Sequence, residues 1–262
     1  MNAPSPPLSV RREGAVAVLT LDRPAARNSL DRELLHALRE ALHAAAADAE
    51  VRAIILTGSG GSFCAGADLK KAMSEGIGDG MDARIDEFHA VIRALVDAPQ
   101  PVVAAIDGAA VGFGCDLALA CDLRVASRRA YLQEKFVQIG LMPDGGGSYT
   151  LARLVGVGRA LQLLLLGERV EADALVGLGL ATAVVEPEAL PQTALELATR
   201  LADGPPLALR AIKRAVREGQ GGSLEDALAR EKAGQLTLLR SEDVMNGVFA
   251  WMQGRKPEFK GR

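Results

Sequence analysis

Two glycine-rich stretches of the sequence have the composition of a site that stabilises a developing negative charge. GSFCAGADL follows the apolar run Ala53–Thr57, and GAAVGFGCDLALACD follows Pro101–Asp107. Each leads into a predicted helix, whose first turn has free backbone N–H groups and a dipole that favours negative charge. One such junction is weak evidence, because glycine is needed at many tight turns. Two junctions brought together by the fold could direct two N–H groups at one oxygen and form an oxyanion hole.

A single carboxylate lies in a third glycine-rich stretch, IGLMPDGGGSYTLARLVG, from Ile139 to Gly156. Asp144 follows a proline there and precedes three glycines. Pro-Asp-Gly is ordinary turn chemistry, in which proline sets φ and aspartate bonds the backbone two residues on. These residues alone favour that local interpretation. The alternative is a catalytic acid or base, for which the rest of the chain must supply the reason.

The sequence indicates no nucleotide loop, serine nucleophile or metal site. It has no G-x-x-x-x-G-K-[ST] or G-x-S-x-G motif, and GFGCDL lacks the third glycine of G-x-G-x-x-G. Cys64, Cys115 and Cys121 form no Cys-x-x-Cys pair, which is typical of buried thiols in a reducing compartment. His36 and His43 have no third ligand nearby, whereas zinc sites use three or four. We therefore expect no metal and a cytoplasmic location.

The elements that would position these stretches alternate between strand and helix. This alternation predicts an α/β layer architecture. The predicted strands are Ala15–Leu21, Ala53–Thr57, Pro101–Gly108, Leu123–Ser127 and Leu180–Glu186, and the predicted helices are 32–50, 82–97 and 188–203.

Beyond Gly204 the strand patterns stop and three helices are predicted. We therefore divide the chain into a catalytic body at 1–203 and a helical region at 204–262. The helical region is too short to bury a good core alone, so we expect it to pack on the body or on another subunit.

Composition excludes two classes of partner. The chain has 262 residues, of which 49% are hydrophobic and 24% charged, as in globular proteins. Its net charge is −3 and only 3% of residues are aromatic, so no basic face or set of stacking rings for nucleic acid is evident. No apolar run reaches the roughly 18 residues that a membrane-spanning helix needs. We expect neither nucleic-acid nor membrane binding.

Five segments, taken in their order and spacing, resemble the crotonase superfamily of enoyl-CoA hydratases and isomerases. They are LDRPAARNSL, FCAGADL, PVVAAIDGAAVGFGCDLALACD, IGLMPDGGGSYTLARLVG and GERVEADALVGLGL. The resemblance covers roughly 10–262. It implies a spiral of repeated ββα units with a C-terminal helical trimerisation region, and hence a homotrimer or a dimer of trimers. It also implies an acyl-CoA thioester as substrate, so coenzyme A arrives with the substrate and no separate cofactor is expected.

The resemblance implies that two backbone N–H groups bind the thioester oxygen, those of Ala67 and Phe113. The family usually has glycine at the second position. Phe113 retains an N–H, but its ring must point elsewhere. Six further positions match those that line the nucleotide end of coenzyme A in the family, although the two cations among them also fit ordinary solvated charge. These positions are Ala26, Arg27, Ala65, Asp68, Leu69 and Lys70.

The carboxylates decide which reaction the resemblance implies. Hydratases of this family use two glutamates, and the first falls on Asp116, whose side chain is one methylene shorter. The second falls on Phe136, which cannot move a proton. Hydration needs positioned carboxylates to deprotonate water and protonate carbon, so this departure argues against it.

Asp144 matches the acid of members that resemble 1,2-epoxyphenylacetyl-CoA isomerase and of some enoyl-CoA isomerases. One carboxylate suffices there, since it removes a proton α to the thioester and returns it two carbons on. We therefore predict an isomerase that uses Asp144, whose pKa burial should raise toward the working range. Phe136, His89 and Met142 are expected to line the substrate pocket.

Three alternatives stay open. The first is a hydratase that uses Asp116 and Asp144. The second is a 4-chlorobenzoyl-CoA dehalogenase-like enzyme with a nucleophilic Asp144 and a histidine at His89, although its tryptophan falls on Phe136. The third is a CoA-ester-binding protein without turnover, in which Asp144 is only a turn residue. The simpler interpretation of His89 is a helix residue near the pocket rim.

Overall fold

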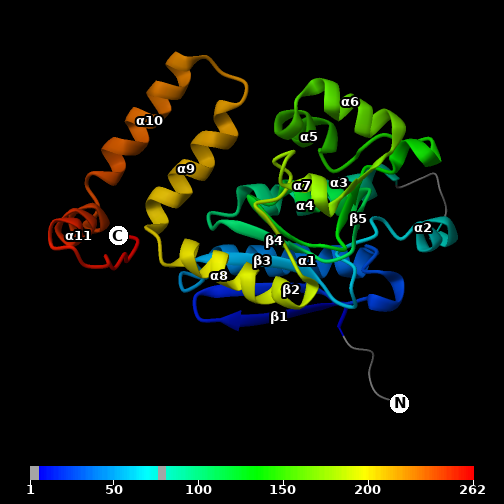
Figure 1. Cartoon of the computed structure of the whole chain (residues 1–262), viewed down its shortest axis with the longest axis horizontal. Coiled ribbons are helices and arrows are strands. Elements are labelled where there is room, and N and C mark those ends of the chain that lie inside the picture. The colour runs from blue at the N-terminus through cyan, green and yellow to red at the C-terminus, as the bar shows by residue number, and fades with distance from the viewer. Residues whose placement is uncertain (1–5, 76–80) are drawn as a thin grey trace.

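The computed structural model describes residues 6–75 and 81–262. The chain forms a mixed α/β body from which a helical arm extends, at the left of Figure 1. A six-stranded sheet organises the body in the order β1-β2-β3-β4-β6-β9, with β1 antiparallel to β2 and the other neighbours parallel. Its strands are β1 (Leu8–Glu13), β2 (Val16–Leu21), β3 (Ala53–Gly58), β4 (Val102–Ile106), β6 (Leu123–Ser127) and β9 (Ala183–Val185).

Helices cover both faces of this sheet, which explains why its central strands are continuously apolar. Alternate residues of β3 point to opposite faces. Ile54 packs in the large core with residues of α1 (Arg32–Ala47), α3 (Met81–Asp97) and α4 (Phe113–Ala120). Ile55 packs in a second core with α8 (Leu190–Ala202).

The body is built from repeated units of two strands and a helix. In each of two consecutive units the first strand joins the large sheet, and the second joins a small sheet of order β5-β7-β8. The small-sheet strands are β5 (Ala109–Val111), β7 (Tyr131–Gln133) and β8 (Arg169–Glu171). Helix α4 begins directly after β5, while the 3₁₀ turn η2 (Phe136–Ile139) and α5 (Gly147–Val155) follow β7. The small sheet therefore brings the start of α4 and the segment before α5 close together.

The strands and helices predicted from the sequence are present, with shifted ends. The first predicted helix ends at Ala47 rather than near residue 50, and its N-cap is Asp31, whose side chain accepts from Leu34 N–H. β1 and the three-residue strands of the small sheet were not predicted, because segments so short show little periodicity. The remaining elements are η1 (Pro24–Ala26), α2 (Leu69–Glu75), α6 (Val157–Leu166), α7 (Ala172–Leu175) and η3 (Pro187–Ala189).

The arm consists of α9 (Pro206–Gly219), α10 (Leu224–Leu238) and α11 (Glu242–Met252). Ion pairs attach its first helix to the body, because Lys213 Nζ lies 2.8 Å and Arg217 Nη2 2.7 Å from the two Asp122 carboxylate oxygens. Lys213 Nζ also donates to Gln100 O at 3.0 Å. The arm exposes many apolar side chains: Ile212, Val216, Leu224, Leu228, Leu236, Leu239, Met245, Val248, Phe249, Trp251 and Met252. No helix in the described part of the chain is long and apolar enough to cross a membrane.

Candidate active site

Backbone hydrogen bonds join the two glycine-rich loops. Cys64 N–H donates to Ala109 O, and Val111 N–H donates to Cys64 O, each at 2.9 Å. Gly66 has φ +89°, and a Cβ there would lie 2.7 Å from Val111 O and 3.4 Å from the Phe113 nitrogen. Glycine is therefore required at this approach, and the Ala67 peptide lies next to the first turn of α4.

Both predicted oxyanion donors lie at this junction. Gly66 O accepts the Leu30 N–H, and Asp68 N–H donates to Leu30 O, as in a short parallel strand pair. The Ala67 N–H between them therefore points away from Leu30. Phe113 begins α4 after the left-handed Gly112, which leaves its N–H free at a helix N-terminus. Neither N–H donates to an acceptor within residues 6–75 and 81–262. This is the arrangement that an oxyanion hole needs.

The Phe113 ring packs against α3 and against the turn after Asp144. It contacts Phe88 of α3 edge to face, with the ring centroids 4.5 Å apart and the planes at 62°. The ring also reaches the turn after Asp144, since a Cβ on Gly145 would lie 2.8 Å from Phe113 Cε2. The phenylalanine ring thus packs between Phe88 and the turn that follows Asp144.

Three carboxyl groups gather beside the start of α4. Asp116, one turn after Phe113, is 2% exposed, and its Oδ2 accepts the Gly145 N–H at 3.0 Å. Glu134, between β7 and η2, is 3% exposed. Asp144 is half-buried. Asp116 Oδ1, both Glu134 oxygens and Asp144 Oδ1 are buried without a hydrogen-bond partner among the described residues.

The glycines after Asp144 let the turn approach these carboxyl groups. A Cβ on Gly145 would lie 2.6 Å from Asp116 Cβ. A Cβ on Gly147 would lie 2.4 Å from Asp116 Oδ1 and 2.8 Å from Glu134 Oε1. Gly146 has φ +91°, a left-handed conformation that disfavours other residues. The run of glycines is therefore more than turn chemistry.

Burial dominates the electrostatics of the cluster. It raises the pKa of Asp144, against the lowering effects of a hydrogen bond from its own backbone N–H and of the nearby His89. Burial, followed by the negative charge of Asp144, raises the pKa of Asp116 to about 7. Burial and then the charge of Asp116 raise the pKa of Glu134 well above its ordinary value. The cluster can therefore hold and exchange protons near neutral pH.

The residues predicted to line the substrate pocket behave differently from one another. The buried Phe136 ring lies beside the α4 N-terminus, since a Cβ on Gly112 would lie 3.8 Å from Phe136 Cζ. His89, half-buried on α3, lies close enough to influence Asp144. Met142 is 70% exposed, so its side chain lies on the surface of the chain rather than inside the site. The expectation for Met142 is therefore not supported by its position.

The residues predicted to contact coenzyme A lie together beside Ala67. Ala65 N–H donates to Arg27 O at 3.0 Å, which joins the η1 turn to the loop before α2. Leu69 and Lys70 are exposed, and Ala26 is half-buried. Asp68 is already engaged, because its Oδ2 lies 3.1 Å from Arg23 Nη2. This carboxylate has a structural contact that the sequence does not reveal.

Glu134 is the residue of this cluster that sequence reasoning missed. The sequence offered one indication of it, because Glu134 lies two residues from Leu132 and from Phe136, and all three are buried. A charged side chain at a buried position usually has a partner or a function. No group of three or more His, Cys, Asp or Glu side chains in the described ranges could hold a metal ion.

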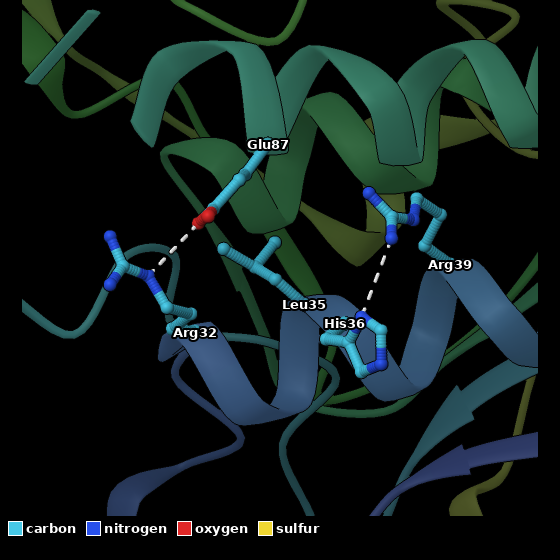
Figure 2. A pocket seen from close by; sticks show the side chains of 5 residues that line it. All are labelled: Arg32, Leu35, His36, Arg39 and Glu87. Atoms are coloured by element: carbon cyan, nitrogen blue, oxygen red, sulfur yellow. Dashed lines mark hydrogen bonds and ion pairs between the residues drawn. The ribbon is translucent and has the colours of Figure 1, made fainter. Parts of the chain in front are cut away.

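A separate cavity of about 220 Å³ lies between α1 and α3 and contains none of these groups. It is lined by Arg32, Leu35, His36, Arg39 and Glu87, and Figure 2 shows Arg32 and Glu87 pointing toward each other. Arg32 Nε donates to Glu87 Oε2 at 3.3 Å, and Arg39 Nη2 lies 3.4 Å from His36 Nδ1. Arg32 pairs with Glu87, Arg39 pairs with Glu40, and none of the carboxyl groups at the start of α4 lines the cavity, so we do not assign the chemistry to it.

Comparison with known proteins shows the same family along almost the whole chain. Residues 11–262 match the family described as enoyl-CoA hydratase/isomerase. The 2,3-dehydroadipyl-CoA hydratase of Escherichia coli K12 is 37% identical, over 97% of this chain and 99% of that protein. The 1,2-epoxyphenylacetyl-CoA isomerase of the same organism is 36% identical, over 95% and 97%.

A solved structure agrees with this assignment. The enoyl-CoA hydratase of Bacillus anthracis superposes with a TM-score of 0.93 at 34% identity, covering 98% of this chain and 100% of that chain. The predicted α/β spiral with a C-terminal helical region is thereby confirmed. The chain belongs to the enoyl-CoA hydratase/isomerase family and has the crotonase fold.

Proposed function

We propose that the protein isomerises an unsaturated, or ring-epoxide, acyl-CoA thioester by moving one proton with Asp144. The observation that carries this proposal is the difference in burial among the three carboxyl groups. Asp144 is half-buried, with an Oδ1 that lacks a partner, whereas Asp116 and Glu134 are buried, so Asp144 is the most accessible of the three carboxyl groups. The apolar ring of Phe136 stands beside the α4 N-terminus, where it offers no second acid or base.

The proposed reaction balances with one carboxylate. For a 3-enoyl thioester, Asp144 removes a proton from the α carbon, and the electron pair delocalises through the double bond onto the thioester oxygen. The Ala67 and Phe113 N–H groups donate to that oxygen and stabilise the dienolate. Asp144 then returns its proton to the carbon two positions on, which gives the conjugated 2-enoyl thioester. A pKa raised by burial suits an aspartate that must both accept and return a proton.

Water addition is the second candidate, and a specific observation favours it. Asp116 has a pKa raised to about 7 beside Asp144, so two carboxyl groups near neutrality are available. The relative from Escherichia coli described above is itself named a hydratase. Against this candidate, Asp116 is buried and its Oδ2 is already bonded to Gly145 N–H. A carboxyl group so placed is poorly positioned to reach a water molecule.

Turnover of matched thioesters tests the proposal. A 3-enoyl-CoA should give a product of the same mass with rising absorbance of the conjugated thioester. A 2-enoyl-CoA should show little loss of that absorbance and little gain of the mass of one water. Asp144→Asn should lower turnover about 10²- to 10⁴-fold while CoA-ester binding is retained. Asp116→Asn keeps an acceptor for Gly145 N–H and should retain most of the isomerase activity.

Two results would refute the proposal. Fast water addition to the 2-enoyl ester without any shift of the 3-enoyl bond would establish the hydratase. Turnover of Asp144→Asn within about threefold of wild type would show that Asp144 does not carry the proton.

We also propose that the chain assembles as a trimer or a dimer of trimers through the arm. The support is the set of exposed apolar side chains on α9, α10 and α11, which neither the body nor the arm covers. Large exposed apolar surfaces mark association sites. Light scattering at micromolar concentration should give at least three times the mass of the chain, and a monomer would contradict the proposal. The proposed chemistry uses no cofactor beyond the coenzyme A of the substrate, and the cytoplasm remains the expected location.

A further inference from the structure

Asp116 and Glu134 form a carboxyl pair that the proposed reaction does not use directly. Their oxygens flank one point, since a Cβ on Gly147 would contact Asp116 Oδ1 at 2.4 Å and Glu134 Oε1 at 2.8 Å. Each of the two carboxyl groups acts on the pKa of the other. Because both residues are buried, water does not screen the pair.

The hydrogen bonds around Asp116 and Glu134 indicate that one of the two carboxyl groups is protonated. With both groups ionised, no hydrogen bond of normal geometry reaches Asp116 Oδ1 or either Glu134 oxygen in the described structure, although the Gly147 N–H lies near Asp116 and the Cys115 thiol, a weak donor, lies near Glu134. The other titratable groups that act on the pair are the Cys115 thiol of α4 and Asp144, with His89 acting on Asp144. None of these supplies a strong positive charge to the pair itself. Two buried, unpaired anions are very costly, whereas one shared proton provides the missing donor.

The contacts decide which member keeps that proton. Asp116 Oδ2 already accepts the Gly145 N–H at 3.0 Å, a contact that favours its ionised form. Glu134 receives no backbone N–H on either oxygen. A protonated Glu134 can donate to Asp116 Oδ1, which leaves Asp116 as an anion with both of its oxygens bonded.

We propose that Glu134 is a positioning residue for Asp144. It keeps its proton while Asp116 is ionised and donates to Asp116, and Asp116 in turn fixes the Gly145 peptide next to Asp144. The chain of contacts runs from β7 through α4 to the turn that carries the proton-transfer group. This inference deepens the proposed function, and only its activity measurement rests on that function.

Two substitutions of Glu134 test whether it acts as a neutral hydrogen-bond donor or as a negative charge. Glu134→Gln is neutral, has nearly the same shape and still donates through its amide. Glu134→Met has a similar length and removes the donor, which leaves Asp116 Oδ1 unbonded. We expect Glu134→Met to lower kcat for 3-enoyl-CoA isomerisation about 10- to 100-fold, the effect of one lost hydrogen bond to a charged group. KM should change little, and Glu134→Gln should recover most of the loss.

Infrared spectroscopy provides a readout that does not depend on turnover. At pH 8 the wild type should show the C=O band of a buried neutral carboxylic acid, shifted on exchange into heavy water. Glu134→Gln should lose this band, and Asp144→Asn should keep it. Absence of the band in the wild type, or its survival in Glu134→Gln, would overturn the inference. So would a Glu134→Gln variant as impaired as Glu134→Met.

The outcomes also separate the two proposals. If the wild type does not isomerise 3-enoyl-CoA but shows the Glu134 band, the proposed function fails and the protonated pair stands. If isomerisation proceeds and the band is missing, the protonated pair fails alone. The infrared comparison of wild type with Glu134→Gln still decides the matter if Glu134→Met does not fold.

Discussion

Gly145→Ala adds a single methyl group at the most crowded point of the site. The new Cβ would lie 2.6 Å from Asp116 Cβ, 2.7 Å from Asp116 Oδ2 and 2.8 Å from Phe113 Cε2, all closer than real Cβ atoms approach. Asp116 and Phe113 belong to α4, every residue of which is buried, so they cannot recede into solvent. The turn that carries Asp144 must move instead.

The cost follows from two effects. Overpacking a well-packed core costs about 1–3 kcal/mol. Moving the turn also breaks the bond from Gly145 N–H to Asp116 Oδ2, and a hydrogen bond to a charged group contributes about 1.5–3 kcal/mol. Gly145 does not have a left-handed φ, so alanine fits the backbone conformation and restricts the unfolded chain, which returns about 0.4–1 kcal/mol. We expect a net loss of about 1.5–5.6 kcal/mol in the free energy of unfolding.

Gly158→Ala is the matched control. It is the same substitution near the start of α6, without a left-handed φ and with no atom within 4 Å of the new Cβ. It should stabilise the protein by about 0.4–1 kcal/mol. Urea unfolding followed by circular dichroism measures both variants, and the 3-enoyl-CoA assay should show lost turnover only for Gly145→Ala. A Gly145→Ala variant as stable and active as Gly158→Ala would refute the packing argument.

Phe113→Ala and Phe113→Pro both remove the ring beside Phe88, at about 3–5 kcal/mol, but only proline also removes the N–H. Proline is accepted at the first helical position, so Phe113→Pro should turn over about 10²- to 10³-fold more slowly than Phe113→Ala, and equal rates would place the oxyanion hole elsewhere. Lys213→Met should cost about 1–3 kcal/mol, because it leaves Asp122 Oδ2 without its cation and loosens α9, which limited proteolysis of the arm detects; an unchanged cleavage rate would contradict this. Burial raises the pKa of Asp116 to about 7, so between pH 4 and pH 7 the folded protein holds a proton that the unfolded chain has lost. The free energy of unfolding should therefore fall as pH rises through this window. Asp116→Asn should make this fall, measured by urea titration, less steep. An unchanged slope would show that another group holds the proton.

The sequence predicted the parts of the fold that depend on local pattern. Apolar runs such as Ala53–Thr57 form the large sheet, and backbone hydrogen bonds join the two glycine-rich junctions that follow them. The three-residue strands of the small sheet were not predictable, because they exist only through pairing with distant segments. The same holds for Glu134, since nothing near it in the sequence shows that Asp116 and Gly147 will pack against it.

The local turn also does not explain why glycine is needed after Asp144. Pro-Asp-Gly is explained by a turn alone, and the need for glycine at 145 and 147 becomes visible only when α4 is in place. Met142 shows another limit, because an apolar residue beside a catalytic candidate suggested a pocket wall, whereas its side chain is 70% exposed and its place in the pocket stays a prediction. Proximity in sequence does not determine which side of the backbone faces the site.

The hydrogen bonds that join the two glycine-rich loops have a consequence for how the enzyme acquires its activity during synthesis. The Cys64 loop is held by Ala109 and Val111, and the α4 segment that follows is in turn closed over by the Gly145 turn. Contacts between such distant segments form late, because chain closure must precede them. A nascent chain that has emerged only as far as α4 can contain helices and paired strands but no complete site. In refolding, recovery of turnover should accordingly lag behind recovery of helicity.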